Sequence, residues 1–180
     1  MRAFVGLPVP ESWGAPILSL LGALGVGRAV AEENLHITLA FLDEISTGQA
    51  EDVHAALELR RLRRVSLSAE GLQTFGGERP KLIALEICAH PALTDLHRSV
   101  ARAAEEAGIA LERRRFRPHV TLARFGHGLS PEGQGRLRRS LEGLTMPELA
   151  EAEIRVARLY RSHLGPGGAS YEVLAEYLLS

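Results

Sequence analysis

The sequence of 180 residues has one cysteine, Cys88, and no apolar run near the roughly 20 residues of a membrane span. A single cysteine cannot form an internal disulfide and lacks the partners of a cysteine-based zinc site, which favours a reducing compartment. The segment from Met1 to Pro10 is interrupted by Pro8 before it reaches the length of a signal-peptide core. We therefore expect a cytoplasmic protein.

The chain also lacks an excess of charge of either sign, since 21 basic residues stand against 22 acidic ones. This balance excludes the strongly basic surface of a protein that coats duplex DNA. Lys81 is the only lysine, so nearly all basic residues are arginine. Arginine binds phosphate bidentately, although genome composition or heat tolerance is the simpler explanation of this bias.

Hydrophobic periodicity predicts strands and helices interspersed along a single domain, residues 1–180. The strands are expected at residues 2–9, 34–42, 64–75, 81–89, 118–125, 151–161 and 170–178, and the helices at 11–24, 46–59, 91–108 and 130–141. Hairpin-like pairs recur, across Gly76-Gly77 and across the turn at residues 165–168, in place of strict strand-helix-strand units. This arrangement predicts an α+β fold with antiparallel sheets.

Two predicted strands repeat the same sequence pattern. Residues 34–42 read NLHITLAFL and residues 117–125 read RPHVTLARF, with His, Thr, Leu and Ala at the same four offsets. Each segment is followed by a predicted helix with a serine cap. The repeat predicts two pseudo-symmetric lobes that face each other across a cleft.

Strand alternation places the histidine and threonine of each copy on one face and the apolar residues on the other. His36 and Thr38 then lie two residues, or about 6.6 Å, apart along the strand, and His119 and Thr121 repeat the arrangement. If the lobes are related by a twofold axis, two imidazoles and two hydroxyls surround one small ligand.

This set of groups suits the cleavage of a phosphodiester. One proton must leave the attacking oxygen and another must reach the leaving oxygen, and imidazole can do either near neutral pH. Threonine hydroxyls can donate to the phosphate oxygens. We expect Ala40 and Ala123, which simple alternation places on the same face, to leave room for the ligand.

HITL at residues 36–39 and HVTL at 119–122 resemble the paired motifs of the 2H phosphoesterase superfamily. Their contexts, NLHITLAFL and FRPHVTLAR, are similar to those of the RNA 2′,3′-cyclic phosphodiesterase family, also called 2′-5′ RNA ligases. FVGLPVP, FGGERPKLIALEI and LYRSHLGPGGASYEVLAEY extend the resemblance over essentially the whole chain. It implies a bilobal α+β fold, no metal and no cofactor. The implied reaction is hydrolysis of a terminal 2′,3′-cyclic phosphate to a 2′-phosphomonoester, with reverse 2′-5′ ligation as a second activity.

The resemblance also implies a role for each motif residue. His36 would be the general acid that protonates the departing 3′ oxygen, and His119 the general base that activates water. Thr38 and Thr121 would hold the phosphate. Because the repeat is nearly symmetric, the sequence leaves open which histidine is the acid and which is the base.

Arg124 follows the second motif, and the resemblance suggests that it contacts phosphate. Strict alternation places Arg124 on the face opposite His119, so this role requires a twist or a bulge at the strand end. Phe41 occupies the aligned position in the first copy. We interpret it as a core residue in preference to a base-stacking one.

The remaining polar residues carry weaker signals. His54 and His97 lie on predicted helices and are expected to be solvated; His90 and His127 lie near turns, and His163 lies in a turn with the cleft mouth as the alternative. One arginine cluster covers residues 60, 61, 63 and 64. A second covers residues 113, 114, 115 and 117 and could guide an RNA backbone.

We expect a monomer that acts on RNA or nucleotide ends without an obligate protein partner. No HExxH spacing, GxSxG elbow or P-loop is present. Two alternatives stay open: a 2H enzyme for another substrate such as 2′-5′ oligoadenylate, and a non-catalytic RNA- or nucleotide-end binding module.

Overall fold

The strands that carry the two motif copies are β3 (His36–Glu44) and β7 (His119–Arg124). The computed structural model describes residues 1–25, 27–112, 114–165 and 168–180. The other strands are β1 (Arg2–Pro8), β2 (Arg28–Ala29), β4 (Val65–Leu67), β5 (Ala69–Phe75), β6 (Leu82–Ile87), β8 (Ala152–Ile154), β9 (Val156–Gly165) and β10 (Gly168–Leu178). The helices are α1 (Gly14–Leu24), α2 (Thr47–Glu58), α3 (Pro91–Glu106) and α4 (Pro131–Glu142), with single 3-10 turns at Glu11–Trp13 and Glu32–Asn34.

Within the described residues, one antiparallel sheet of eight strands has the order β10-β9-β1-β3-β7-β6-β5, with β2 paired to β7. The motif strands β3 and β7 are therefore neighbours at its centre. We call the strands on the β3 side the His36 half and those on the β7 side the His119 half. Strands β4 and β8 form a separate two-stranded sheet. This architecture is the predicted α+β fold with antiparallel sheets.

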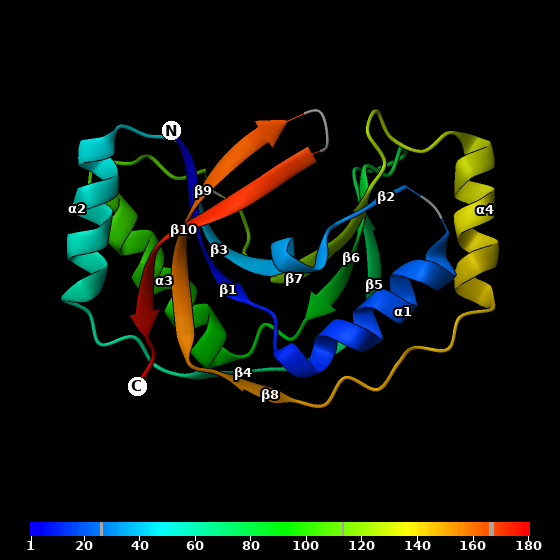
Figure 1. Ribbon diagram of the computed structural model, residues 1–180, viewed down its shortest axis with the longest axis horizontal. Helices are drawn as coiled ribbons and strands as arrows, with labels where there is room; N and C mark the ends of the chain where they lie inside the picture. The colour runs from blue at the N-terminus through cyan, green and yellow to red at the C-terminus, as the bar shows by residue number, and fades with distance from the viewer. Residues whose placement is uncertain (26, 113, 166–167) are drawn as a thin grey trace.

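The helices are exchanged between the two halves. α1 follows β1 but packs against β7 and α4, whereas α3 follows β6 but packs against β3 and α2. Figure 1 shows the result: α2 and α3 lie at one end of the molecule, and α1 and α4 lie at the other. Each half is covered partly by chain that belongs to the other, which ties the two motif copies together.

Local sequence signals set the helix boundaries. Ser46 and Gln49 form the capping box expected from their spacing, with reciprocal hydrogen bonds of 3.0 and 3.1 Å. Ser130 caps α4, and Gly25 ends α1 in the left-handed conformation. His90 is the N-cap of α3, a role that the sequence reading missed.

Three predicted elements differ from the observed ones. The strand expected over residues 64–75 is broken near Ser68, whose carbonyl accepts a hydrogen bond from the Cys88 amide at 2.9 Å. The strand expected over 151–161 is broken at Arg155, and the helix expected from Glu11 opens with a 3-10 turn. Part of the predicted turn at 165–168, residues 166 and 167, lies outside the described residues.

The core lies between the sheet and the helices. Trp13, Ile17 and Leu20 are buried from the first helical segment, while Leu93 and Val100 are buried from α3. Burial of such large side chains is the main favourable contribution to folding, at about 1.5–3 kcal/mol each. In the described part of the chain, every helix is too short or too polar to span a bilayer.

Candidate active site

The two motif strands meet at a single residue pair, Ile37 of β3 and Val120 of β7. These residues occupy the same position of the repeat, so a local twofold axis passes between them. Both are fully buried. In an antiparallel pair, residues that face each other share one side of the sheet and their neighbours share the other. Both His-x-Thr pairs therefore project from the same face, opposite to the core.

Extending this register places His36 opposite Thr121 and Thr38 opposite His119. The two histidines are then diagonal neighbours, which in a regular ladder lie about 7–8 Å apart. All four side chains are partly exposed, and the charge of His119 acts on His36. The structure thus brings the four predicted motif residues together on one surface, which we call the cleft face.

The two imidazole rings are held in the same way. His36 donates from Nδ1 to the carbonyl of Asn34 at 2.7 Å, and His119 donates from Nδ1 to the carbonyl of Arg117 at 2.8 Å. Because a carbonyl only accepts, the neutral rings carry their proton on Nδ1. Nε2 is left with its lone pair and is the nitrogen available to a ligand.

Aromatic rings enclose His36. Its centroid lies 4.6 Å from Phe4, 4.9 Å from the edge-on ring of Tyr171 and 6.1 Å from Tyr160. Burial, followed by the positive charge of Arg124, lowers the pKa of His36 to about 4. His36 is therefore neutral at pH 7 in the unliganded protein.

The surroundings of His119 are more charged. Its ring stacks on Phe75 at 4.7 Å, and the Arg117 guanidinium covers the same phenyl ring at 4.8 Å. Burial lowers the pKa of His119, Arg124 and Arg117 lower it further, and the Glu86 carboxylate opposes them. The two rings thus share a tautomer but differ in their electrostatic environment.

Each motif strand has a β-bulge directly after its threonine. In the β1–β3 pair, Thr38 faces Gly6 and Ala40 faces Val5, so Leu39 has no partner on β1. A bulge adds one residue and reverses the alternation that follows it. The prediction that Ala40 lies on the cleft face is wrong, because Ala40 is only 5% exposed and joins the core.

The same shift occurs in the other half. Thr121 faces Ala84 and Ala123 faces Ile83, which leaves Leu122 without a partner on β6. Ala123 is 1% exposed, so its predicted place on the cleft face is also wrong. Two adjacent apolar residues, Leu-Ala in both copies, break the period of two and are the signal by which the bulges could have been found.

The bulges bring the next residue of each strand to the cleft face. Arg124 is exposed, and its positive charge lowers the pKa of both histidines. The bulge that its predicted phosphate contact requires is therefore present. Phe41 is 45% exposed and lies under the Arg2 guanidinium at 4.9 Å. The interpretation of Phe41 as a core residue is therefore wrong.

Small residues do flank the threonines, but from the neighbouring strands. Gly6 faces Thr38 and Ala84 faces Thr121. A Cβ atom on Gly6 would lie 2.8 Å from the carbonyl oxygen of Ile37, so this position accepts only glycine without a shift of the backbone. Each threonine therefore has a small neighbour on the outer side of its strand, Gly6 on β1 and Ala84 on β6.

A hollow of about 390 Å³ opens beside the motifs on the His36 half. It is lined by Arg2, Phe4, Thr38, Phe41, Arg124, Ser162, Leu164, Gly165, Gly168, Ala169 and Tyr171. Residues of β9 and β10 form one wall. Asn34 holds this wall through a 3.1 Å hydrogen bond from Nδ2 to the Ala169 carbonyl. The hollow therefore continues the cleft face from Thr38 toward β9 and β10.

The other histidines lie apart from this face. His97 is half-buried and not solvated as predicted, because its Nδ1 bonds the Leu39 carbonyl at 2.7 Å and its ring stacks on Phe116 at 4.0 Å. His97 thus provides a hydrogen-bond partner for the carbonyl of Leu39, the bulge residue that has no partner on β1. His163 bonds Glu172 at 2.9 Å and does not line the hollow.

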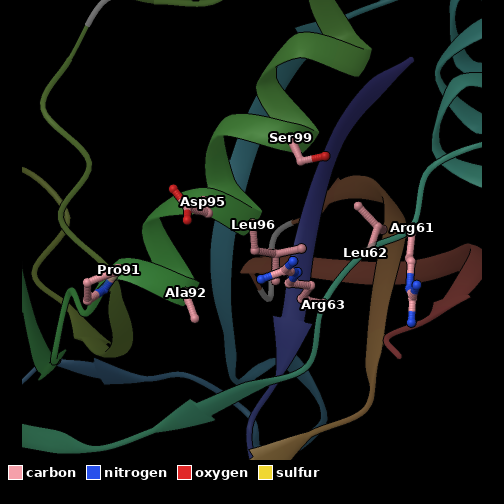
Figure 2. A pocket seen from close by; sticks show the side chains of 8 residues that line it. All are labelled: Arg61, Leu62, Arg63, Pro91, Ala92, Asp95, Leu96 and Ser99. Carbon is pink, nitrogen blue, oxygen red and sulfur yellow. The ribbon is translucent and has the colours of Figure 1, made fainter.

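The first arginine cluster also lies elsewhere. Figure 2 shows Arg61 and Arg63 beside the first turns of α3, at a separate hollow of about 440 Å³ that contains none of the motif residues. In the second cluster, Arg113 lies outside the described residues and Arg114 pairs with Glu112 at 2.5 Å. Among the described residues of the two clusters, Arg117 is the one whose charge acts on a motif histidine.

Comparison with known proteins identifies the family. The 2′-5′ RNA ligase superfamily matches residues 10–160. The chain belongs to this superfamily. An RNA 2′,3′-cyclic phosphodiesterase of Geobacillus stearothermophilus is 31% identical over 156 residues, which cover 83% of this chain and 47% of the relative, so the chain spans about half the length of that protein.

A protein of the same name from Archaeoglobus fulgidus is 29% identical over 178 residues and matches in full length, at 97% of this chain and 98% of the relative. Among solved structures, apo Escherichia coli LigT superimposes with a TM-score of 0.78 at 22% identity, covering 99% of this chain and 97% of that one. This likeness supports the superfamily fold over the whole chain.

Proposed function

We propose that residues 1–180 form one bilobal catalytic unit that hydrolyses a terminal 2′,3′-cyclic phosphate of RNA or a nucleotide to a 2′-phosphomonoester without a metal ion. The observation that carries the proposal is the cleft face itself. Two imidazoles whose Nδ1 atoms bond backbone carbonyls, two threonines and one guanidinium share this face, and small residues flank the threonines. The names of the relatives from Geobacillus and Archaeoglobus support the same activity.

In the proposed mechanism the Nε2 atom of each ring transfers one proton, and the division of roles is the one that the family resemblance implies. His119 accepts a proton from water, whose oxygen forms a bond to phosphorus. The bond from phosphorus to the 3′ oxygen breaks, and His36 donates a proton to that oxygen. The 2′ ester bond stays intact. The atoms balance: water supplies one hydroxyl to phosphorus and, through the two rings, one proton to the 3′ oxygen.

In the proposed mechanism, the negative charge of the bound phosphate favours protonation of His36. His36, with a pKa of about 4, must gain a proton before it can act as an acid at pH 7. A phosphodiester anion beside the ring favours imidazolium, because an opposite charge stabilises the charged form. Thr38, Thr121 and Arg124 donate hydrogen bonds to the non-bridging oxygens, where a preorganised donor typically contributes about 10²–10³ in rate.

The proposal extends to the cellular setting and the oligomeric state. Cys88 is a free thiol, which suits a reducing compartment. We therefore place the protein in the cytoplasm, and we propose separately that it acts on RNA ends as a monomer.

The test is product analysis after incubation with a 2′,3′-cyclic mononucleotide in the presence of EDTA. The expected product is the 2′-monophosphate, identified by phosphorus NMR. A 3′-monophosphate contradicts the mechanism, and activity that EDTA abolishes and zinc restores contradicts metal independence. Tight binding without turnover contradicts the enzyme and favours the binding module. The matched control is His119→Ala, which removes the base and leaves the fold testable by circular dichroism.

A further inference from the structure

The two halves differ at one position beside each histidine. In the β1–β3 pair His36 faces Pro8, and in the β6–β7 pair His119 faces Glu86. Residues directly opposite in an antiparallel pair have Cβ atoms about 4.5–5.5 Å apart on the same face. Glu86 therefore lies beside His119 on the cleft face, whereas the equivalent residue beside His36 has no charge.

Glu86 belongs to a connected group around the His119 ring. Arg117 Nη2 lies 3.4 Å from Glu86 Oε1 and also donates to Gln73. The same guanidinium covers one ring, Phe75, that stacks on His119. The backbone carbonyl of Arg117 accepts from His119 Nδ1. Glu86 thus contacts Arg117. Arg117 in turn acts on His119 in two ways, through the Phe75 ring that its guanidinium covers and through its own backbone carbonyl.

The charges that face His119 come from three elements. Arg117 precedes β7, Arg124 ends it, and Glu86 lies on β6, while His36 approaches from β3. The two arginines disfavour the imidazolium form of His119. Of the groups that act on this ring in the described residues, Glu86 is the one carboxylate that stabilises the imidazolium.

We propose that Glu86 is a positioning residue for His119, which orients the ring through Arg117 and stabilises the imidazolium that forms when His119 takes a proton from water. The inference rests on the proposed function, because it assigns the base of that reaction. Glu86 does not touch the phosphate. Its effect on catalysis passes through the basicity and the orientation of one ring.

The test is Glu86→Gln, which keeps the shape and removes the charge. We expect the pKa of His119, followed by NMR of the ring in the unliganded protein, to fall while that of His36 changes less. The acidic limb of the pH–rate profile should move to lower pH, and kcat should fall by about tenfold, the equivalent of one pKa unit, with KM little changed. Glu86→Asp, which keeps the charge, should restore most of both.

The matched control is Glu70→Gln, since Glu70 lines the neighbouring surface with Glu86 but is not among the groups that act on His119. An unchanged His119 pKa in Glu86→Gln, or an equal fall in Glu70→Gln, overturns the inference even where the wild-type protein hydrolyses the cyclic nucleotide. Absence of turnover by the wild-type protein overturns the proposed function instead. The two failures are therefore distinguishable.

Discussion

The His36 half and the His119 half share a backbone plan but not a charge environment. Both place the motif on a central strand, insert a bulge after the threonine and tie Nδ1 to the carbonyl two residues earlier. Around His36 the neighbours are aromatic rings and a proline. Around His119 they include Glu86 and Arg117.

This difference shows how a nearly symmetric fold can carry out an asymmetric reaction. A proton donor and a proton acceptor need different environments at the same pH. The backbone repeat supplies the geometry for both rings. The pair of Pro8 and Glu86 supplies a charge beside one ring only, and two further aligned pairs, Phe41 with Arg124 and Gly6 with Ala84, also differ between the halves.

The largest expected effect comes from removing either ring. His36→Ala and His119→Ala should each reduce kcat on a 2′,3′-cyclic nucleotide by about 10²–10⁴-fold, the usual contribution of a general acid or base. Initial rates measure the activity of each variant, and circular dichroism shows whether it is folded. Full activity in one folded variant would show that this histidine is not part of the catalytic pair, and the comparison of the two halves as acid and base would be wrong.

The pair Phe41 and Arg124 gives the next effect. Arg124→Gln should lower kcat by about 10²-fold, because it removes a preorganised donor to the phosphate. It should also raise the pKa of both histidines, since the Arg124 charge lowers both. Phe41→Leu should leave both histidine pKa values unchanged. Steady-state kinetics and histidine NMR check these outcomes; equal effects of the two variants would show that position and not charge matters here.

Stability should depend on pH through His36. Its pKa is about 4 in the folded protein against 6.5 in the unfolded chain, so the unfolded state binds more protons between these values. The free energy of unfolding should therefore fall by about 3 kcal/mol as pH drops from 6.5 to 4. Urea denaturation at several pH values measures this, and His36→Gln should flatten the curve more than His119→Gln. An identical slope in all three proteins contradicts the burial of His36 as a neutral ring.

The smallest effect concerns Gly6 and Ala84, the small residues opposite the two threonines. Gly6→Ala should destabilise the protein by about 1–3 kcal/mol, because the new methyl meets the Ile37 carbonyl oxygen at 2.8 Å and forces the backbone apart. Ala84→Gly, at the equivalent position, should cost only about 0.5–1 kcal/mol through lost backbone restraint. Thermal unfolding distinguishes them, and a cost for Gly6→Ala no larger than that for Ala84→Gly would contradict the close approach of Gly6 to the Ile37 carbonyl.

The local periodicity of the sequence predicted the four helices and most strands in their order, but it missed β2 and the breaks within residues 64–75 and 151–161. Capping at Ser46 and the helix start at Pro91 depend on neighbouring residues and were predicted correctly. The joining of β3 to β7 depends on contacts between residues 83 positions apart, and only the repeat indicated it.

Simple alternation failed after Thr38 and Thr121, because it cannot represent a bulge. Ala40 and Ala123 were therefore placed on the wrong face, and Phe41 was assigned to the core. The contribution of Glu86 was also hidden, since its position opposite His119 is a property of the β6–β7 register and not of either segment alone.

The most direct test of the account is a crystal structure with a bound 2′-nucleotide product. We expect one phosphorus atom whose oxygens lie within hydrogen-bond distance of Nε2 of His36 and Nε2 of His119, with the hydroxyls of Thr38 and Thr121 on the remaining oxygens. A phosphate bound outside the cleft face, for example beside Arg61 and Arg63, or one that only a single motif histidine reaches, would contradict it.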